Sequence, residues 1–162
     1  MRILGSRLAR PILSILAIAM ILASTFSIIS PPARAYTSRD PIVISGNADF
    51  TAANGVTGGT GTASDPYVIS GWSIYADASV SSGIGIEIRN TTAFFIIRSV
   101  DVGGNGFGAV LSRVVNGRME SSSIGAACLG VGIKDSINVT LSGNFIGGGS
   151  DIDCRIVCFV VE

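Results

Sequence analysis

Short runs of alternating apolar and polar residues make up most of the chain after residue 35, and glycine, serine or asparagine separates one run from the next. Apolar residues occupy every second position in such a run, as at Ile86 and Ile88 or at Val131 and Ile133. A period of two is typical of short strands joined by tight turns. No stretch after residue 35 has the spacing of an amphipathic helix. The pattern therefore predicts an all-β domain.

The strand pattern itself repeats along the chain. An apolar anchor followed by Ser-Gly, or by a weaker version of it, recurs at a spacing that settles to about 22 residues, within the range of known repeat architectures. A second series of alternating apolar pairs steps by nearly the same amount. The first series is anchored at Ile44, Ile69, Ile96, Met119 and Leu141, and the second begins at Ile86, Ala109, Val131 and Cys154. Agreement between two series indicates a repeat protein.

A repeat of this length is too short to close a sheet within itself. Coils stacked about 4.8 Å apart would give each strand two parallel neighbours. We therefore expect a parallel β-helix, a solenoid of about five coils, with the five anchors in one vertical file and with Asn47 and Asn144 in the left-handed conformation at corners. The expected inward positions are Ile44, Ile69, Ile86, Ile88, Ile96, Leu111, Val131, Ile133, Val139 and Leu141. An antiparallel β-sandwich is the alternative, but it predicts no such period.

Residues 1–35 have the features of an export signal, a hydrophobic helix preceding the β-helix domain at 36–162. An apolar run covers 12–29, prolines follow it, and Ala33-Arg34-Ala35 has the small-x-small form of a cleavage site. Three arginines begin the segment, namely Arg2, Arg7 and Arg10. An uncleaved membrane anchor is the alternative, since the apolar run is near the lower limit for spanning a bilayer. Both interpretations predict a secreted or extracytoplasmic, cell-surface protein.

The composition excludes several classes of function. The chain has no histidine, and all 11 acidic residues but only part of the 11 basic ones follow residue 35. An acidic domain is a poor partner for nucleic acid, and the lack of histidine removes the commonest general base and transition-metal ligand. We expect no cofactor and no metal site.

Several segments resemble right-handed parallel β-helix proteins, the NosD-like or pectin-lyase-like exported repeat family. The likeness covers about 41–147 and is carried by 46–51, 54–56, 61–72, 85–91, 95–98 and 138–144. It implies a right-handed solenoid and a carbohydrate-binding, sugar-hydrolase or copper-accessory setting. The residues of the repeat specify turns and strands, so the resemblance indicates a fold rather than a set of catalytic groups. The copper role conflicts with the absence of histidine, and we expect Met119 in the core.

The outward charged groups do not form an acid/base pair in the predicted stack. Glu87 would share a column with Val110 and Gly132, and Arg89 would share the next with Ser112 and Lys134. An enzyme acting on uronic-acid polymers would need Asp101 to lie near a basic residue. We therefore assign no catalytic residue and favour a non-enzymatic carbohydrate-binding or adhesive module, with a polysaccharide lyase or hydrolase as the alternative.

Individual residues suggest further sites. Trp72 is a candidate for stacking on a sugar ring, although a packed lid is the alternative. Asn90 and Asn138 head glycosylation sequons. Cys128 and Cys154 are candidates for a disulfide that closes about one coil. The segment 147–153 resembles a calcium-binding repeat, but a single copy favours a turn.

In the predicted stack we expect a last, incomplete coil from residue 154. An exposed rung must be capped or it recruits another chain. Three interpretations remain open: the chain is a fragment of a longer protein, the residues from 157 onward fold back as a cap, or the end self-associates.

Overall fold

The computed structural model describes residues 35–80, 82–126 and 128–148. These residues belong to a unit spanning Arg34–Glu162, whereas the predicted export signal, apart from Ala35, lies outside the described residues and stays a prediction. Within the described part, no helix has both the length and the apolar character needed to cross a membrane.

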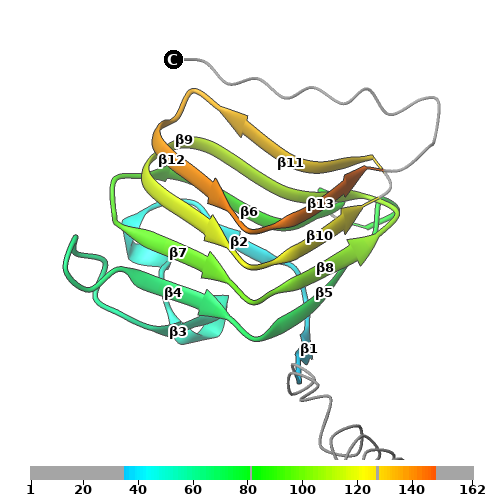
Figure 1. Ribbon diagram of the computed structural model, residues 1–162, viewed down its shortest axis with the longest axis horizontal. Coiled ribbons are helices and arrows are strands. Elements are labelled where there is room, and N and C mark those ends of the chain that lie inside the picture. The colour runs from blue at the N-terminus through cyan, green and yellow to red at the C-terminus, as the bar shows by residue number, and fades with distance from the viewer. Residues whose placement is uncertain (1–34, 81, 127, 149–162) are drawn as a thin grey trace, which may run out of the picture. The chain divides into compact units, whose positions relative to one another are not determined.

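The described chain is mostly β, as the alternating pattern predicts, and almost all its strand pairs are parallel (Figure 1). One five-stranded sheet has the order β1-β5-β8-β10-β13. Its strands are β1 (Thr37–Arg39), β5 (Trp72–Ala76), β8 (Asp101–Gly104), β10 (Ser123–Ala126) and β13 (Phe145–Gly148).

An eight-stranded sheet forms the rest of the domain and curls around β9. The first half of the long strand β9 (Phe107–Glu120) pairs with β6 and β11, and its second half pairs with β7 and β12. The other members are β2 (Ile42–Ile44), β3 (Val56–Gly58), β4 (Tyr67–Ser70), β6 (Ile84–Thr91), β7 (Phe95–Arg98), β11 (Leu129–Lys134) and β12 (Ile137–Ser142). Among the described strands, only the pair β3–β4 is antiparallel. Two 3-10 helices, η1 (Asn47–Asp49) and η2 (Ala52–Asn54), precede β3.

The sequence distance between paired residues falls along the chain and then becomes constant. It is largest between β2 and β6, where Ile42 pairs with Ile86, and smaller between β5 and β8, where Ile74 pairs with Val102. From β8 onward, the pairs β8–β10, β10–β13, β9–β11 and β9–β12 all share one separation. The hydrogen bond from Val100 N to Ser122 Oγ spans the same 22 positions. The parallel pairing at the predicted period is confirmed.

Aligned strands place like residues in columns, but the single predicted file of anchors is wrong. Ile44 lies in a column with Ile88, Leu111 and Ile133. A second column contains Ile69, Ile97, Met119 and Leu141. The extra residues between β2 and β4 move Ile44 to a different part of the sheet from Ile69. Ile96 is partly exposed and lies beside Val68 and Arg118, so Ile97 takes its predicted inward place. The other predicted inward residues are buried or partly buried, except the end residue Leu141 at 39 % exposure.

A column of glycines makes room for the side chains of the five-stranded sheet. Gly108 lies on β9, and a Cβ there would be 2.3 Å from Cγ2 of Ile124. The corresponding distance is 2.5 Å from Gly85 to Cγ1 of Val102, and 2.6 Å from Gly130 to Cγ2 of Ile146. Val102, Ile124 and Ile146 are themselves aligned on β8, β10 and β13. These glycines therefore set how closely the two sheets approach.

Left-handed residues recur at the corners, but Asn47 and Asn144 are not among them. The residues with positive φ include Asn90, Arg113 and Asp135 at one corner and Ser99 and Ser121 at another. Asn144 instead acts through its side chain: its Oδ1 accepts a hydrogen bond from Ser122 N at 3.0 Å, and its Nδ2 donates to Met119 O at 2.8 Å. The amide thereby joins consecutive repeats, a role that a corner pattern alone does not reveal.

Candidate functional site

A concave surface lies on the outer face of β7, β9 and β12. It is a groove of about 450 Å³. Its lining residues are Ala63, Pro66, Phe94, Phe95, Ile96, Asn116, Gly117, Arg118, Glu120, Asn138, Thr140 and Ser142. Hydroxyl, amide, guanidinium and carboxylate groups face one continuous depression, which suits a polar ligand more than an apolar one.

Because the strands are paired in register, their outward side chains form two rows that run across the strands. One row crosses the strands as Val68, Ile96, Arg118 and Thr140, and the next as Ser70, Arg98, Glu120 and Ser142. Each member alternates with an inward residue, because successive side chains of a strand point to opposite faces. Neighbouring members of a row are about 4.8 Å apart. The second row is therefore polar at every strand, whereas the first row is polar only at Arg118 and Thr140.

The charges in the groove are only partly neutralised. Arg118 Nη1 lies 3.8 Å from Glu120 Oε2, and their side chains are 52 % and 28 % exposed. Arg98 occupies the position beside Glu120, is exposed, and lines an adjoining depression with Glu120, Ser70 and Ser99. Two guanidinium groups thus accompany one carboxylate, which gives this face a small positive excess.

Asparagine residues form a ladder at one side of the groove. Asn138 Nδ2 donates to Asn116 Oδ1 at 2.8 Å, and Asn116 Nδ2 donates to the carbonyl of Thr92 at 3.3 Å. The ladder fixes both amides, which leaves further lone pairs of these side chains directed toward solvent or ligand. Asn138 is the second predicted glycosylation site, and it is exposed.

A turn that precedes β4 forms the opposite wall. The amides of Thr60 and Gly61 both donate to the carbonyl of Asp65, at 3.0 and 2.9 Å. Phe94 N donates to the carbonyl of Gly61 at 3.0 Å, which ties this turn to the start of β7. Pro66 and Phe94 are both partly exposed and provide the groove with apolar surface.

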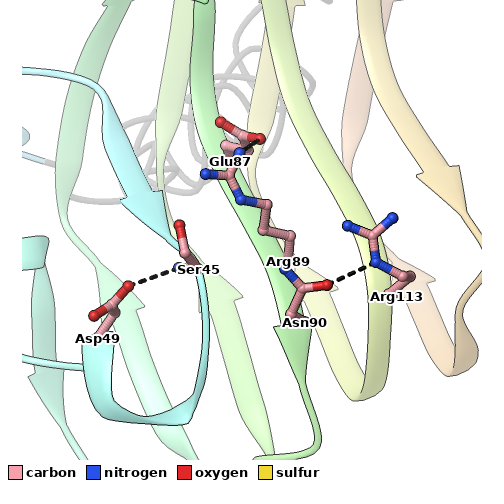
Figure 2. A network of polar contacts seen from close by, with 6 residues as sticks. All are labelled: Ser45, Asp49, Glu87, Arg89, Asn90 and Arg113. Carbon is pink, nitrogen blue, oxygen red and sulfur yellow. Dashed lines mark hydrogen bonds and ion pairs between the residues drawn. The ribbon is translucent and has the colours of Figure 1, made fainter.

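The outer face of β6 carries a different polar network, shown in Figure 2. Glu87 forms an ion pair with Arg89, so its carboxylate is already partnered. Asn90 is exposed and its Oδ1 accepts from Arg113 Nε at 2.6 Å. The predicted columns Glu87–Val110–Gly132 and Arg89–Ser112–Lys134 are confirmed.

The other candidate residues lie apart from the groove. Asp101 is on β8 beside Ser73 and Ser123 and has no ion pair within the described part of the chain. Met119 is fully buried, which confirms its place in the core. Over the described ranges, no group of histidine, cysteine and acidic residues has a metal-binding arrangement. The predicted calcium-like turn lies mainly outside the described residues.

Trp72 is held by neighbouring residues of the protein. Its Nε1 donates to the carbonyl of Gly55 at 2.8 Å, and the guanidinium of Arg39 lies 5.0 Å from its ring centroid. The ring also packs against the core. This geometry favours the lid over the sugar-stacking role, which stays a prediction.

Cys128 takes part in a disulfide. The predicted partner Cys154 lies outside the described residues, so the pairing Cys128–Cys154 stays a prediction.

Arg98, Arg118 and Glu120 received no role from the sequence, and the groove was not predicted. Applying the repeat period to this part of the chain would have aligned the segments 96–98, 118–120 and 140–142. The wall made by the turn before β4 has no repeat signal and could not be found that way.

Comparison of the chain with protein-family models, with curated proteins and with solved structures gives no match.

Proposed function

We propose that the chain is an exported, non-enzymatic protein that binds a polysaccharide or surface glycan in the groove on β7, β9 and β12. In this proposal the described strands are coils of a right-handed parallel β-helix, akin to the NosD-like and pectin-lyase-like repeat proteins. The protein would act as a carbohydrate-binding or adhesive module at the cell surface.

The groove is the observation that supports this function. Its polar groups include Arg118, Asn116, Asn138, Thr140 and Ser142, which can donate hydrogen bonds to the oxygen atoms of a hydroxyl-rich chain. Pro66 and Phe94 offer apolar surface for the C–H face of a sugar. Because the row of Ser70, Arg98, Glu120 and Ser142 runs across the strands, an extended polymer lying along this row would meet a polar side chain on each coil.

The same geometry favours binding over catalysis. Among the described residues that line this groove, Glu120 is the one carboxylate, and Arg118 lies beside it. Hydrolysis of a glycosidic bond generally uses two carboxyl groups on opposite sides of the bond. Asp101 belongs to the five-stranded sheet and does not line the groove.

Binding of the purified protein to an array of neutral and acidic polysaccharides tests the proposal. We expect Arg118→Ala to weaken binding about tenfold, since a charge-assisted hydrogen bond contributes on the order of 1.5–3 kcal/mol. Lys134→Ala is the matched control, because it removes one exposed cation from the outer face of β11, away from the groove. The proposal fails if no polysaccharide binds, or if the two variants weaken binding equally.

A further inference from the structure

Arg98 is an exposed residue at the end of β7, beside the groove. It belongs to a depression of about 480 Å³, which we call the Arg98 depression. The lining residues are Ser70, Gly71, Arg98, Ser99, Glu120 and Ser121. Because Glu120 lines both the groove and the Arg98 depression, the two hollows are neighbours. A polymer that occupies the groove can therefore place a substituent in the Arg98 depression.

The guanidinium of Arg98 has unused hydrogen-bond donors. Within the described part of the chain, its side chain takes part in no ion pair and no hydrogen bond. Every other arginine in that part has a partner. The partners are the Ala53 carbonyl for Arg39, Glu87 for Arg89, Asn90 for Arg113 and Glu120 for Arg118. A guanidinium carries five N–H donors in a planar fork that matches the oxygen atoms of an oxyanion.

Glu120 is a neighbour of Arg98 but does not pair with it. The two residues are aligned across β7 and β9, whereas the Glu120 carboxylate lies 3.8 Å from the guanidinium of Arg118. Two cations and one anion leave a net positive charge on these three side chains. This excess is local, because all 11 acidic residues of the chain but only part of its 11 basic residues follow residue 35.

A neutral hydroxyl and an anionic group would use this local charge differently. An exposed guanidinium is already hydrated, so a sugar hydroxyl that replaces water gains little. A hydrogen bond between two ionised groups is about twice as strong as one between neutral groups. Ser99 adds a hydroxyl donor to the same depression. The Arg98 depression therefore favours an anionic group over a hydroxyl.

We propose that Arg98 makes the site selective for polysaccharides that carry an anionic group, a carboxylate or a sulfate ester, and that this group binds in the Arg98 depression. The inference rests on the proposed glycan-binding function and adds the residue that discriminates between charged and neutral polymers. Glu120 opposes the same anionic group and limits its affinity.

Matched pairs of polymers test the selectivity of the unaltered full-length protein. The probes are alginate with its carboxyl-reduced form, and carrageenan with its desulfated form. We expect at least one acidic polymer to bind about tenfold more tightly than its neutral form, and this preference to fall as salt is added. A preference within the alginate pair identifies a carboxylate, and one within the carrageenan pair identifies a sulfate ester.

Charge-changing variants test the assignment to Arg98. Arg98→Gln should weaken binding of the preferred acidic polymer about tenfold and leave binding of its neutral form unchanged. Glu120→Gln should act in the opposite direction and strengthen binding of the acidic polymer. Lys134→Gln is the matched control, because it makes the same change in net charge at an exposed position that does not line either hollow. It should leave the affinity unchanged.

The possible failures of the inference and of the proposed function are distinguishable. Equal affinity for the acidic and neutral forms, or binding of neutral polymers alone, would overturn the selectivity and leave polysaccharide binding in place. Equal losses for Arg98→Gln and Lys134→Gln would show that overall charge, rather than Arg98, produces the preference. Binding to no polysaccharide at all would overturn both the inference and the proposed function.

Discussion

The early part of the domain, from β1 to β6, and the later part, from β8 to β13, build similar parallel sheets by different means. In the later part the sequence separation between paired residues is constant, as from Val102 to Ile124 and from Ile124 to Ile146. In the early part it is larger and uneven, as from Thr37 to Trp72 and from Ile42 to Ile86. The extra residues form η1, η2, β3 and the loop between β5 and β6.

The two parts also differ in what holds them together. In the early part, the rings of Phe50 and Tyr67 stack with centroids 4.6 Å apart, and Phe50 lies 5.7 Å from Phe95. In the later part, small residues such as Ser122 and Asn144 join the repeats. Where the period is constant, these side-chain hydrogen bonds recur at a separation of 22 positions. Where the period is broken, Asn47 Oδ1 still accepts from Thr92 N, but across 45 positions, and aromatic contacts without a counterpart in the later part add to the packing.

The largest expected effect comes from removing the aromatic centre of the early part. Phe50→Ala should destabilise the domain by about 4 kcal/mol, because Phe50 is 6 % exposed and its loss leaves a cavity. Phe107→Ala, at a site 38 % exposed, is the control and should cost far less. Urea unfolding followed by circular dichroism measures both. Equal shifts would show that the early part does not depend on this cluster.

The glycine column formed by Gly85, Gly108 and Gly130 provides a test of how the strands of the later part pack. Gly108→Ala should cost about 3 kcal/mol, since the added Cβ would lie 2.3 Å from Ile124 and 2.4 Å from the carbonyl of Gly130. Gly125→Ala is the matched control on β10, where a Cβ would meet no atom within 4 Å. Unfolding midpoints that fall equally for both variants would contradict the described sheet packing.

The side-chain bridges between repeats have an intermediate effect. Asn144→Ala should destabilise by about 1–2 kcal/mol, because it leaves Ser122 N and the Met119 carbonyl without their partner. Asn138→Ala removes an exposed bridge to Asn116 and should cost about 0.5 kcal/mol. Chemical unfolding measures both variants. If Asn138→Ala lowered the free energy of unfolding more than Asn144→Ala, burial would not determine how much these hydrogen bonds contribute to stability.

The smallest effect concerns the loop that interrupts the early repeat. Hydrogen bonds from the Ser79 side chain and backbone to Asp77 lower the pKa of its carboxyl below the ordinary 3.8. A lowered pKa in the folded state means that this stabilisation is complete above pH 3.8 and is lost as the pH falls through the folded value. Ser79→Ala should therefore raise the pKa of Asp77 toward 3.8, as measured by NMR titration. An unchanged titration curve would exclude this contact in solution.

The sequence was sufficient to predict the strands and the period. The alternation of apolar and polar residues is visible within each strand, and a constant period places equivalent residues side by side when the strands pair in parallel. Residues Leu111, Met119 and Ile133 show this correspondence. The early part could not be predicted in the same way. The position of Ile44 depends on the path of the inserted residues, and the contact between Phe50 and Tyr67 has no counterpart elsewhere in the repeat.

The candidate site was less accessible to prediction than the fold. Arg118 and Glu120 are visible in the sequence as charged residues, but the groove beside them depends on the turn at Thr60–Asp65, which lies well before them in the chain. Long-range placement of a non-repeating turn leaves no pattern along the sequence.

Backbone nuclear Overhauser effects in the isotopically labelled protein test most directly whether residues one repeat apart are paired in parallel. The account predicts cross-strand contacts that join Val102 to Ile124 and Ile124 to Ile146. Contacts between sequential strands in antiparallel register, such as β7 with β8, would contradict it and indicate a sandwich of hairpins instead.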